Sequence, residues 1–391
     1  MADETGIEWC DSTFNPWRGC TKISPACDHC FAEKLVVGRF KLDVWGAGKP
    51  RVRSSPAYWR KPLRWNARRF MQCNTCGWRG ECAAELIGCG RCRSTDHLHD
   101  VRRRVFCASL ADVFDNEVPP AWRADLLALI RQTPNLDWLL LTKRIGNAEQ
   151  MLQDACEEMD VGMGIYAPSI YPNLWLGATI CNQAEADRDI PKLLATPAAV
   201  RFVSIEPMLG PIDLTNVREA IGPRGRVCYR NTIEAKDANP AHTDLVAAFG
   251  PDYPYARIDW VIAGGESGVD ARPSHPDWFR KLRDDCLPAG VPFLFKQWGE
   301  WHTSVSSMVT GESCFLQFES FSHWVNKAST WVRGGVCLDH DGAQLRNGSD
   351  MQRASEKGKF PVTIMHRVGK KTAGRHLDGC EHTAFPRGYD A

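Results

Sequence analysis

The chain has 391 residues, enough for one large α/β domain of roughly 250 to 300 residues together with inserted modules. Its 43% hydrophobic and 24% charged residues are ordinary for a globular protein, and the net charge of +1 gives no overall indication of a nucleic-acid partner. No run of 18 apolar residues is present, and residues 1–6 lack the apolar core of a secretory signal. We therefore expect a cytoplasmic protein without a membrane partner.

In chain order, one short strand is expected before Cys20. From about residue 104, apolar runs of four to eight residues alternate with amphipathic stretches. Such runs suit buried parallel strands, so the alternation predicts an α/β fold, a partial or complete parallel βα barrel. The expected strands are Val105–Leu110, Trp138–Leu141, Leu174–Thr179, Val200–Ile205, Trp260–Ala263 and Pro292–Phe295, and the expected helices are Ala121–Arg131, Ala148–Met159, Gln183–Leu194 and Pro276–Leu287.

Two stretches interrupt this alternation and divide the chain into five segments. Residues 1–48 hold the first cysteine group, and residues 49–104 form a basic, aromatic segment with a cysteine-rich insert. Residues 105–302 are the body of the barrel. Residues 303–360, rich in Ser and Gly, are expected to be an insert or lid, and residues 361–391 are a C-terminal segment.

Polar residues follow each expected strand. Because the carboxyl ends of the strands of a βα barrel meet at the face that carries active sites, these residues predict a shared polar cavity. Polar residues also simply begin loops, and the acids could be buried partners of Lys143 or Arg144; both alternatives stay open. The strand ends supply the candidate catalytic residues Lys143, Glu206 and Lys296, and the candidate cofactor-binding residues Ser204, Glu206, Gly264, Gly265 and Glu266.

The chain has 17 cysteines, which in a reducing compartment indicate metal ligation rather than disulfides. Cys20, Cys27 and Cys30 lie on one short stretch, with gaps of six and two residues. A cubane iron–sulfur cluster takes four ligands, so three thiolates leave one iron open for a small molecule. The alternative is a structural zinc site completed by His29 or Cys10. Phe31 could pack over the cluster or over a bound adenine.

The line Ile7–Cys20 closely resembles a phage-associated protein family with a three-cysteine motif, which is described as radical S-adenosylmethionine-like. The usual first gap in the radical S-adenosylmethionine superfamily is three residues, whereas this family has a gap similar to the one here. The resemblance implies a barrel of radical S-adenosylmethionine type, a [4Fe-4S] cluster, S-adenosylmethionine, and an electron donor such as a flavodoxin or ferredoxin. Further similar segments are Trp59–Asn66, Ser109–Asp115, Leu141–Arg144, Phe202–Pro207, Gly264–Gly268, Phe295–Glu300 and Val368–Arg375.

A second cysteine group consists of Cys73, Cys76, Cys89 and Cys92, two C-x2-C pairs separated by 12 residues. This spacing is typical of a zinc ribbon, in which four thiolates close the coordination of a structural Zn²⁺. An auxiliary iron–sulfur cluster is the alternative. Cys82, His97 and His99 are spare ligands.

The flank of this ribbon is basic. Residues 49–71 contain eight Lys or Arg and no acid, interleaved with Tyr58, Trp59, Trp65 and Phe70. Basic groups neutralise phosphates and aromatic rings stack on bases, which favours a nucleic-acid contact. The alternative is a solvated loop, or arginines packed on the barrel. The candidate nucleic-acid residues are Arg60, Lys61, Arg64, Arg68 and Arg69.

Together these features predict a radical enzyme that modifies a base of phage DNA in the host cytoplasm. One such reaction, in thymidine hypermodification, isomerises an amino-acid adduct on the thymine 5-methylene from an N-linked to a C-linked form. A target base would have to be exposed, as base-flipping enzymes do. Two alternatives remain: a radical lyase that repairs a DNA photoproduct, and a non-enzymatic, zinc-dependent DNA-binding protein.

Overall fold

The computed structural model describes residues 5–81, 88–95, 97–159, 166–221, 226–234, 236–237, 256–309 and 311–386. The chain divides into two compact units. The first comprises residues 1–179, 192–202 and 386–391, and the second comprises residues 180–191 and 203–385. Among the described helices, none has the length and apolar character needed to cross a membrane.

A seven-stranded sheet carries the fold, with strand order β1-β7-β8-β9-β10-β14-β15. The pairs β1·β7, β7·β8, β8·β9 and β14·β15 are parallel. This mixed α/β architecture is compatible with the predicted partial βα barrel. The strands are β1 (Ser12–Phe14), β7 (Arg103–Cys107), β8 (Leu136–Thr142), β9 (Leu174–Thr179), β10 (Val200–Ile205), β14 (Trp260–Gly264) and β15 (Phe293–Gln297).

The strands are buried along almost their whole length, as continuous apolar runs require. Trp138, Trp175 and Trp260 have at most 1% of their surface exposed. The helices also match the predicted stretches, and α4 and α8 each begin with a proline at the first turn, where the missing N–H costs nothing. The helices are α4 (Pro120–Gln132), α5 (Ile145–Glu158), α6 (Gln183–Ala195) and α8 (Pro276–Cys286).

The first cysteine group follows the short strand β2 (Trp17–Arg18), which pairs with β3 (Val52–Arg53). It spans a 3₁₀ turn, η1 (Pro25–Cys27), and ends at α1 (Phe31–Glu33) and the π-helical turn η2 (Lys34–Arg39). Val36 and Val44 pack with Leu110 in a small core beneath this segment. The segment is therefore anchored to the loop that follows β7.

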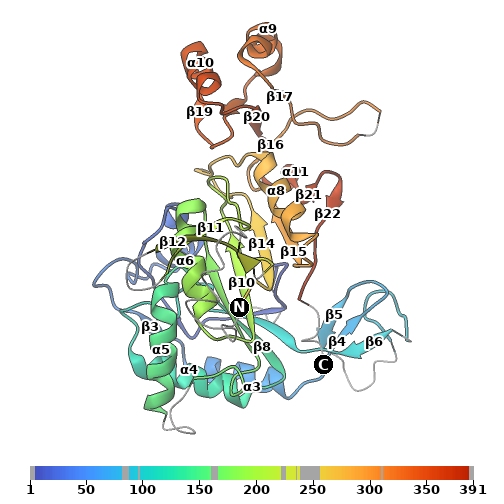
Figure 1. Cartoon of the computed structure of the whole chain (residues 1–391). Coiled ribbons are helices and arrows are strands. Elements are labelled where there is room, and N and C mark those ends of the chain that lie inside the picture. The colour runs from blue at the N-terminus through green and yellow to red at the C-terminus, as the bar shows by residue number, and fades with distance from the viewer. Residues whose placement is uncertain are drawn as a thin grey trace. The chain divides into compact units, whose positions relative to one another are not determined.

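Residues 49–104 form two short helices and a small antiparallel sheet of order β5-β4-β6. Figure 1 shows β4, β5 and β6 lying together. The predicted ribbon insert is therefore a distinct sheet. The elements are α2 (Pro56–Trp59), α3 (Lys61–Asn66), β4 (Phe70–Cys73), β5 (Arg79–Glu81) and β6 (Leu98–Asp100).

Residues 303–360 contribute to a small α/β module in the second unit. Its strand β20 lies beyond residue 360 and pairs with β16, β17 and β18, so the sheet crosses that expected boundary. Its core includes Phe318, Met351 and Val362. The elements are β16 (Trp301–His302), β17 (Gln317–Phe318), α9 (Phe321–Trp331), β18 (Val336–Leu338), β19 (Gln344–Leu345), α10 (Gly348–Glu356) and β20 (Val362–Arg367).

The second unit also contains two smaller antiparallel sheets, of order β11-β12-β13 and β21-β22. A short helix, α11 (Lys370–Ala373), precedes the latter pair. The strands are β11 (Val217–Ile221), β12 (Arg226–Asn231), β13 (Lys236–Asp237), β21 (His376–Leu377) and β22 (Cys380–Glu381).

Candidate functional site

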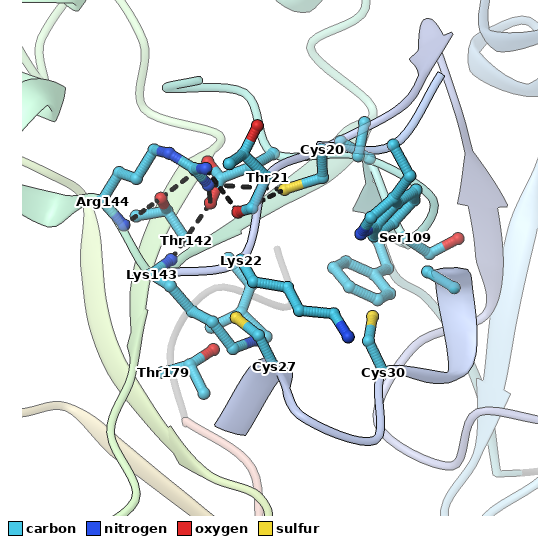
Figure 2. A pocket seen from close by; sticks show the side chains of 17 residues that line it. Cys20, Thr21, Lys22, Cys27, Cys30, Ser109, Thr142, Lys143, Arg144 and Thr179 are labelled. Atoms are coloured by element: carbon cyan, nitrogen blue, oxygen red, sulfur yellow. Dashed lines mark hydrogen bonds and ion pairs between the residues drawn. The ribbon is translucent and has the colours of Figure 1, made fainter. Parts of the chain in front are cut away.

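The first cysteine group lines a cavity of about 120 Å³ in the first unit. Figure 2 shows the sulfurs of Cys20, Cys27 and Cys30 around this cavity, with Lys22 reaching between them. The other side of the cavity is formed by residues that follow β7, by the last residue of β8 and the two after it, and by the last residue of β9, so three of the predicted polar strand ends do share one cavity. These residues are Ser109, Asp112, Thr142, Lys143, Arg144 and Thr179.

Asp112 organises the charged side of the cavity. It is 5% exposed, and its carboxylate accepts hydrogen bonds from the Thr142 hydroxyl at 2.7 Å and from the Lys143 amide at 3.2 Å. Arg144 Nη1 lies 3.2 Å from the same carboxylate and 3.4 Å from Cys20 Sγ. The ends of two neighbouring strands therefore meet at one cysteine through a buried ion pair.

The cysteine loop is fixed by close backbone packing. Gly19 has φ of +108°, and a Cβ there would lie 2.4 Å from the Val44 carbonyl oxygen, so this position requires glycine. Arg51, 6% exposed, pairs with Asp115 at 2.7 Å and donates to the Thr21 hydroxyl at 2.8 Å. Arg51 was not expected at the site, because in the sequence it is one of eight similar basic residues.

Burial raises the pKa of the Cys20 thiol to about 12, and the Asp112 carboxylate adds to this rise while the Arg144 guanidinium opposes it. A free thiol here would stay protonated at neutral pH. A metal ion bound at Cys20 would favour its thiolate form.

The spacing of the sulfurs separates this cavity from a mononuclear metal site. Among the described residues, Cys73, Cys76, Cys89 and Cys92 are the one group of three or more ligands whose donor atoms all lie within 4.8 Å of one another. The three sulfurs of the cavity do not form such a group. In a cubane cluster each cysteine binds a different iron, so a wider spacing and a set of three thiols fit that cofactor.

The second cysteine group is compact. The sulfurs of Cys73 and Cys92 are 3.6 Å apart and those of Cys76 and Cys89 are 3.5 Å apart. A Zn–S bond of about 2.3 Å gives a tetrahedral S–S edge of about 3.8 Å, close to these distances. This group of four cysteines could therefore hold a metal ion such as Zn²⁺.

Backbone N–H groups complete the compact site. The amides of Arg91 and Cys92 point at Cys89 Sγ from 3.4 and 3.5 Å. Burial opposes ionisation of Cys89, yet these amides and the neighbouring thiols lower its pKa to about 6. His97 and His99 are not members of the group, and Cys82 lies outside the described residues.

The remaining polar strand ends lie in the second unit. The Glu206 carboxylate, after β10, is 3.1 Å from the Lys296 ammonium on β15. A Cβ on Gly264 would lie 2.7 Å from the same carboxylate. Gln297 donates to the Ser267 hydroxyl at 3.1 Å. These residues form a second polar cluster, and Glu206 has a basic partner other than Lys143 or Arg144.

Glu266 has a structural role in this geometry. It forms a two-pronged ion pair with Arg272, with contacts of 2.7 and 2.9 Å, and is 7% exposed. Gly265 allows close backbone approach, since a Cβ there would lie 1.9 Å from the Trp298 carbonyl oxygen. Ser204 is 2% exposed within β10. Gly265 and Glu266 therefore have close partners within the protein.

Two expectations about aromatic residues differ from the structure. Phe31 is 76% exposed and does not line the cavity, which Ala32 does instead. In the basic flank, Tyr58 stacks on Phe14 with the centroids 5.2 Å apart, and Trp65 is 4% exposed. These rings pack within the protein and are not free to stack on bases.

The basic residues of the flank divide into two kinds. Arg68 contacts Glu81 at 2.7 Å, and Arg69 contacts Asp100 at 2.6 Å, so these two link α3 to the ribbon sheet. Lys61 lies 5.6 Å from the ring centre of Tyr58. Arg60 and Arg64 are exposed. The last two are the members of the predicted set best placed to meet an outside polyanion.

No curated protein and no solved structure matches the chain. The family model described as "Protein of unknown function (DUF5131)" matches residues 4–386. Since this match covers nearly the whole sequence, the chain belongs to the DUF5131 family.

Proposed function

We propose that this protein is a radical S-adenosylmethionine enzyme that holds a [4Fe-4S] cluster on Cys20, Cys27 and Cys30. The observation that supports this most is the donor set of the cavity. It has three thiols from one loop, and none of its other lining residues is a cysteine or histidine. Such a set leaves one iron for the methionine part of the cofactor. A closed zinc site would need a fourth ligand.

Cys20, Cys27 and Cys30 would hold the cluster, which would supply the one-electron reducing chemistry that S-adenosylmethionine needs for radical formation. The chain's own residues position and shield the reactants. Arg144 fixes Cys20, and the Lys143 ammonium is the cation that we assign to the carboxylate of the methionine part. Trp45, Phe106 and Leu141 form the apolar wall that limits access of water to the cavity.

The second unit has a polar pair of its own, Glu206 and Lys296, which we assign to binding an amino-acid group. Their side chains are 13% and 24% exposed, so both are reachable while partly desolvated. A paired carboxylate and ammonium can bind an α-amino acid through its two charged ends, or can exchange a proton with it. This fits an amino-acid adduct better than an unmodified base.

The substrate that we propose is DNA with an amino-acid adduct on the thymine 5-methylene, which the enzyme isomerises from the N-linked to the C-linked form. The exposed Arg60 and Arg64 support a backbone contact. A small low-potential protein such as a flavodoxin or ferredoxin would supply the electron in the cell.

The test is anaerobic reconstitution of the full chain with iron and sulfide, followed by reduction with dithionite in the presence of S-adenosylmethionine. We expect about four iron and four sulfide per chain and formation of 5′-deoxyadenosine. Cys20→Ala should abolish both results. Cys380→Ala, which removes an exposed cysteine on β22, is the matched control and should change neither.

The substrate is tested separately by nucleoside mass spectrometry. DNA carrying the N-linked adduct should give the C-linked nucleoside, whereas ultraviolet-damaged DNA should be unchanged. Repair of the damaged DNA would favour the lyase instead. A chain that takes up only zinc after reconstitution would contradict the enzyme hypothesis and leave the DNA-binding alternative.

A further inference from the structure

Arg144 is a buried cation at the edge of the three-cysteine cavity, which Lys22 and Lys143 also line. Its side chain is only 8% exposed. Nη1 donates to Cys20 Sγ at 3.4 Å and to Asp112 Oδ2 at 3.2 Å, and Nη2 donates to the Thr21 carbonyl oxygen at 2.7 Å. Figure 2 shows these contacts converging between the end of β8 and the cysteine loop. One guanidinium therefore binds a cysteine sulfur, the backbone beside it and a carboxylate.

The guanidinium has little freedom to move. Asp112, its counter-charge, is held by the Phe114 amide at 3.0 Å as well as by Thr142 and Lys143. The backbone of Arg144 is fixed in turn, because its amide donates to the Thr142 hydroxyl at 2.8 Å. Because hydrogen bonds hold both its counter-charge and its backbone, the Arg144 guanidinium keeps one geometry toward Cys20 Sγ. Such fixed dipoles and charges act without reorganisation cost.

A buried charge this close to a ligand sulfur has an electrostatic consequence. Reducing a cluster adds a negative charge, which a nearby cation stabilises and a nearby anion destabilises. Hydrogen bonds to the sulfurs and local net charge are among the factors that set cluster potentials. Arginine stays charged at all relevant pH values, so its effect is constant. Arg144 and Asp112 lie side by side and should act in opposite directions.

We infer that Arg144 is a positioning residue that raises the reduction potential of the cluster through its hydrogen bond to Cys20, with Asp112 as an opposing charge. This inference rests on the proposed function, since it requires the cluster. It assigns Arg144 and Asp112 to control of electron uptake rather than to substrate binding.

The experiment is a dithionite titration of the reconstituted full chain, followed by electron paramagnetic resonance, with iron and sulfide measured in each sample. Arg144→Met should shift the midpoint potential to a more negative value. At a given solution potential, a smaller fraction of the cluster should then be reduced. Asp112→Asn should shift it to a more positive value. Arg131→Met removes the same charge from the exposed end of α4 and should leave the potential unchanged.

Shifts of the midpoint potential in opposite directions indicate electrostatic control. A merely structural role would lower the cluster content of both variants without shifting the two potentials in opposite directions. Unmoved potentials, or shifts in the same direction, would overturn the inference. If Arg144→Met retains no iron, Asp112→Asn decides: a more positive potential supports the inference, and an unchanged one overturns it.

A wild-type chain without iron and sulfide would overturn the proposed function and this inference with it, whereas an intact cluster with unmoved potentials overturns the inference alone.

Discussion

The two cysteine groups of the first unit use the same side chain in different ways. In the ribbon, four thiols lie within 4.8 Å of one another, and backbone amides point at one of them. In the cavity, the three thiols are not such a compact group, and charged side chains face the cavity from the ends of two strands. The ribbon offers a closed set of ligands, whereas the cavity leaves room for a reactant.

The difference shows that thiol number and thiol spacing carry separate information. Four close thiols satisfy one tetrahedral ion and leave no position for chemistry. Three separated thiols suit a cofactor that is itself several atoms wide. The charged surroundings differ for the same reason, because a reactive site needs groups that bind or tune a reactant, and a structural site needs only neutralised thiolates. The predictions below test this separation, beginning with the largest effect.

Removing one thiol of the cavity should abolish iron binding and leave the ribbon unaffected. For Cys30→Ser we expect iron to fall from about four per chain to almost none while zinc stays near one. The measurement is elemental analysis of the purified and reconstituted chain. A comparable loss of zinc in this variant would show that the two sites depend on each other.

The reciprocal change is Cys76→Ser in the ribbon. Zinc should be lost, and since zinc binding contributes about 10 kcal/mol or more in zinc-finger peptides, the small sheet β5-β4-β6 should unfold locally. Hydrogen exchange should report faster exchange in residues 70–100 and unchanged exchange in β7 to β9. Retention of slow exchange in the ribbon would mean that its sheet is stable without metal.

Gly19 tests how strictly the loop of the cavity is positioned. Gly19→Ala places a Cβ against the Val44 carbonyl oxygen at a positive φ, and should cost about 2 kcal/mol and reduce the iron content. Gly48→Ala is the matched control, since Gly48 also has positive φ, +71°, but nothing lies within 4 Å of the added carbon. It should cost about 1 kcal/mol and leave iron unchanged. Chemical unfolding and iron analysis compare the two, and equal iron content would contradict tight positioning.

The smallest expected effect concerns the basic flank of the ribbon. Replacing both Arg60 and Arg64 by Ala should weaken DNA binding about tenfold. The slope of the logarithm of the binding constant against the logarithm of the salt concentration should become shallower by about two. Replacing Arg68 and Arg69 should matter less for DNA, because Glu81 and Asp100 already neutralise them. Binding titrations at several salt concentrations measure both. A larger loss in the second pair would place the DNA contact on the ribbon itself.

Much of the fold could be predicted. The bounds of β9 and β10 agree with the expected runs, and α4, α6 and α8 agree to within a residue at each end. The strands were recognisable because burial on both faces demands continuous apolar runs, and the ribbon because metal ligands need fixed local spacing. The module around α9 and α10 could not be read, because its short strands pair over long separations and carry no periodic pattern.

The candidate site could be predicted only in part from the sequence. Cys20, Cys27 and Cys30 stand out by spacing, and Lys143 by its place after a strand. The basic run, however, gave no sign that Arg51 is a buried brace of the loop, that Arg68 and Arg69 have acidic partners, or that Tyr58 and Trp65 pack inward. Nor did the Gly-Gly-Glu motif reveal that Glu266 pairs with Arg272.

The sequence by itself determined where most of the buried strands of the seven-stranded sheet lie, which cysteines belong to which group, and that one group has three thiols and the other four. These properties are local, since they depend on apolar runs and on spacing within a few residues. Only the tertiary structure decided the partner of each charge: Arg144 with Cys20 and Asp112, Lys296 with Glu206. Ion pairs between strand ends depend on how the sheet aligns distant segments, and that alignment follows from the packing of the whole unit rather than from any single motif.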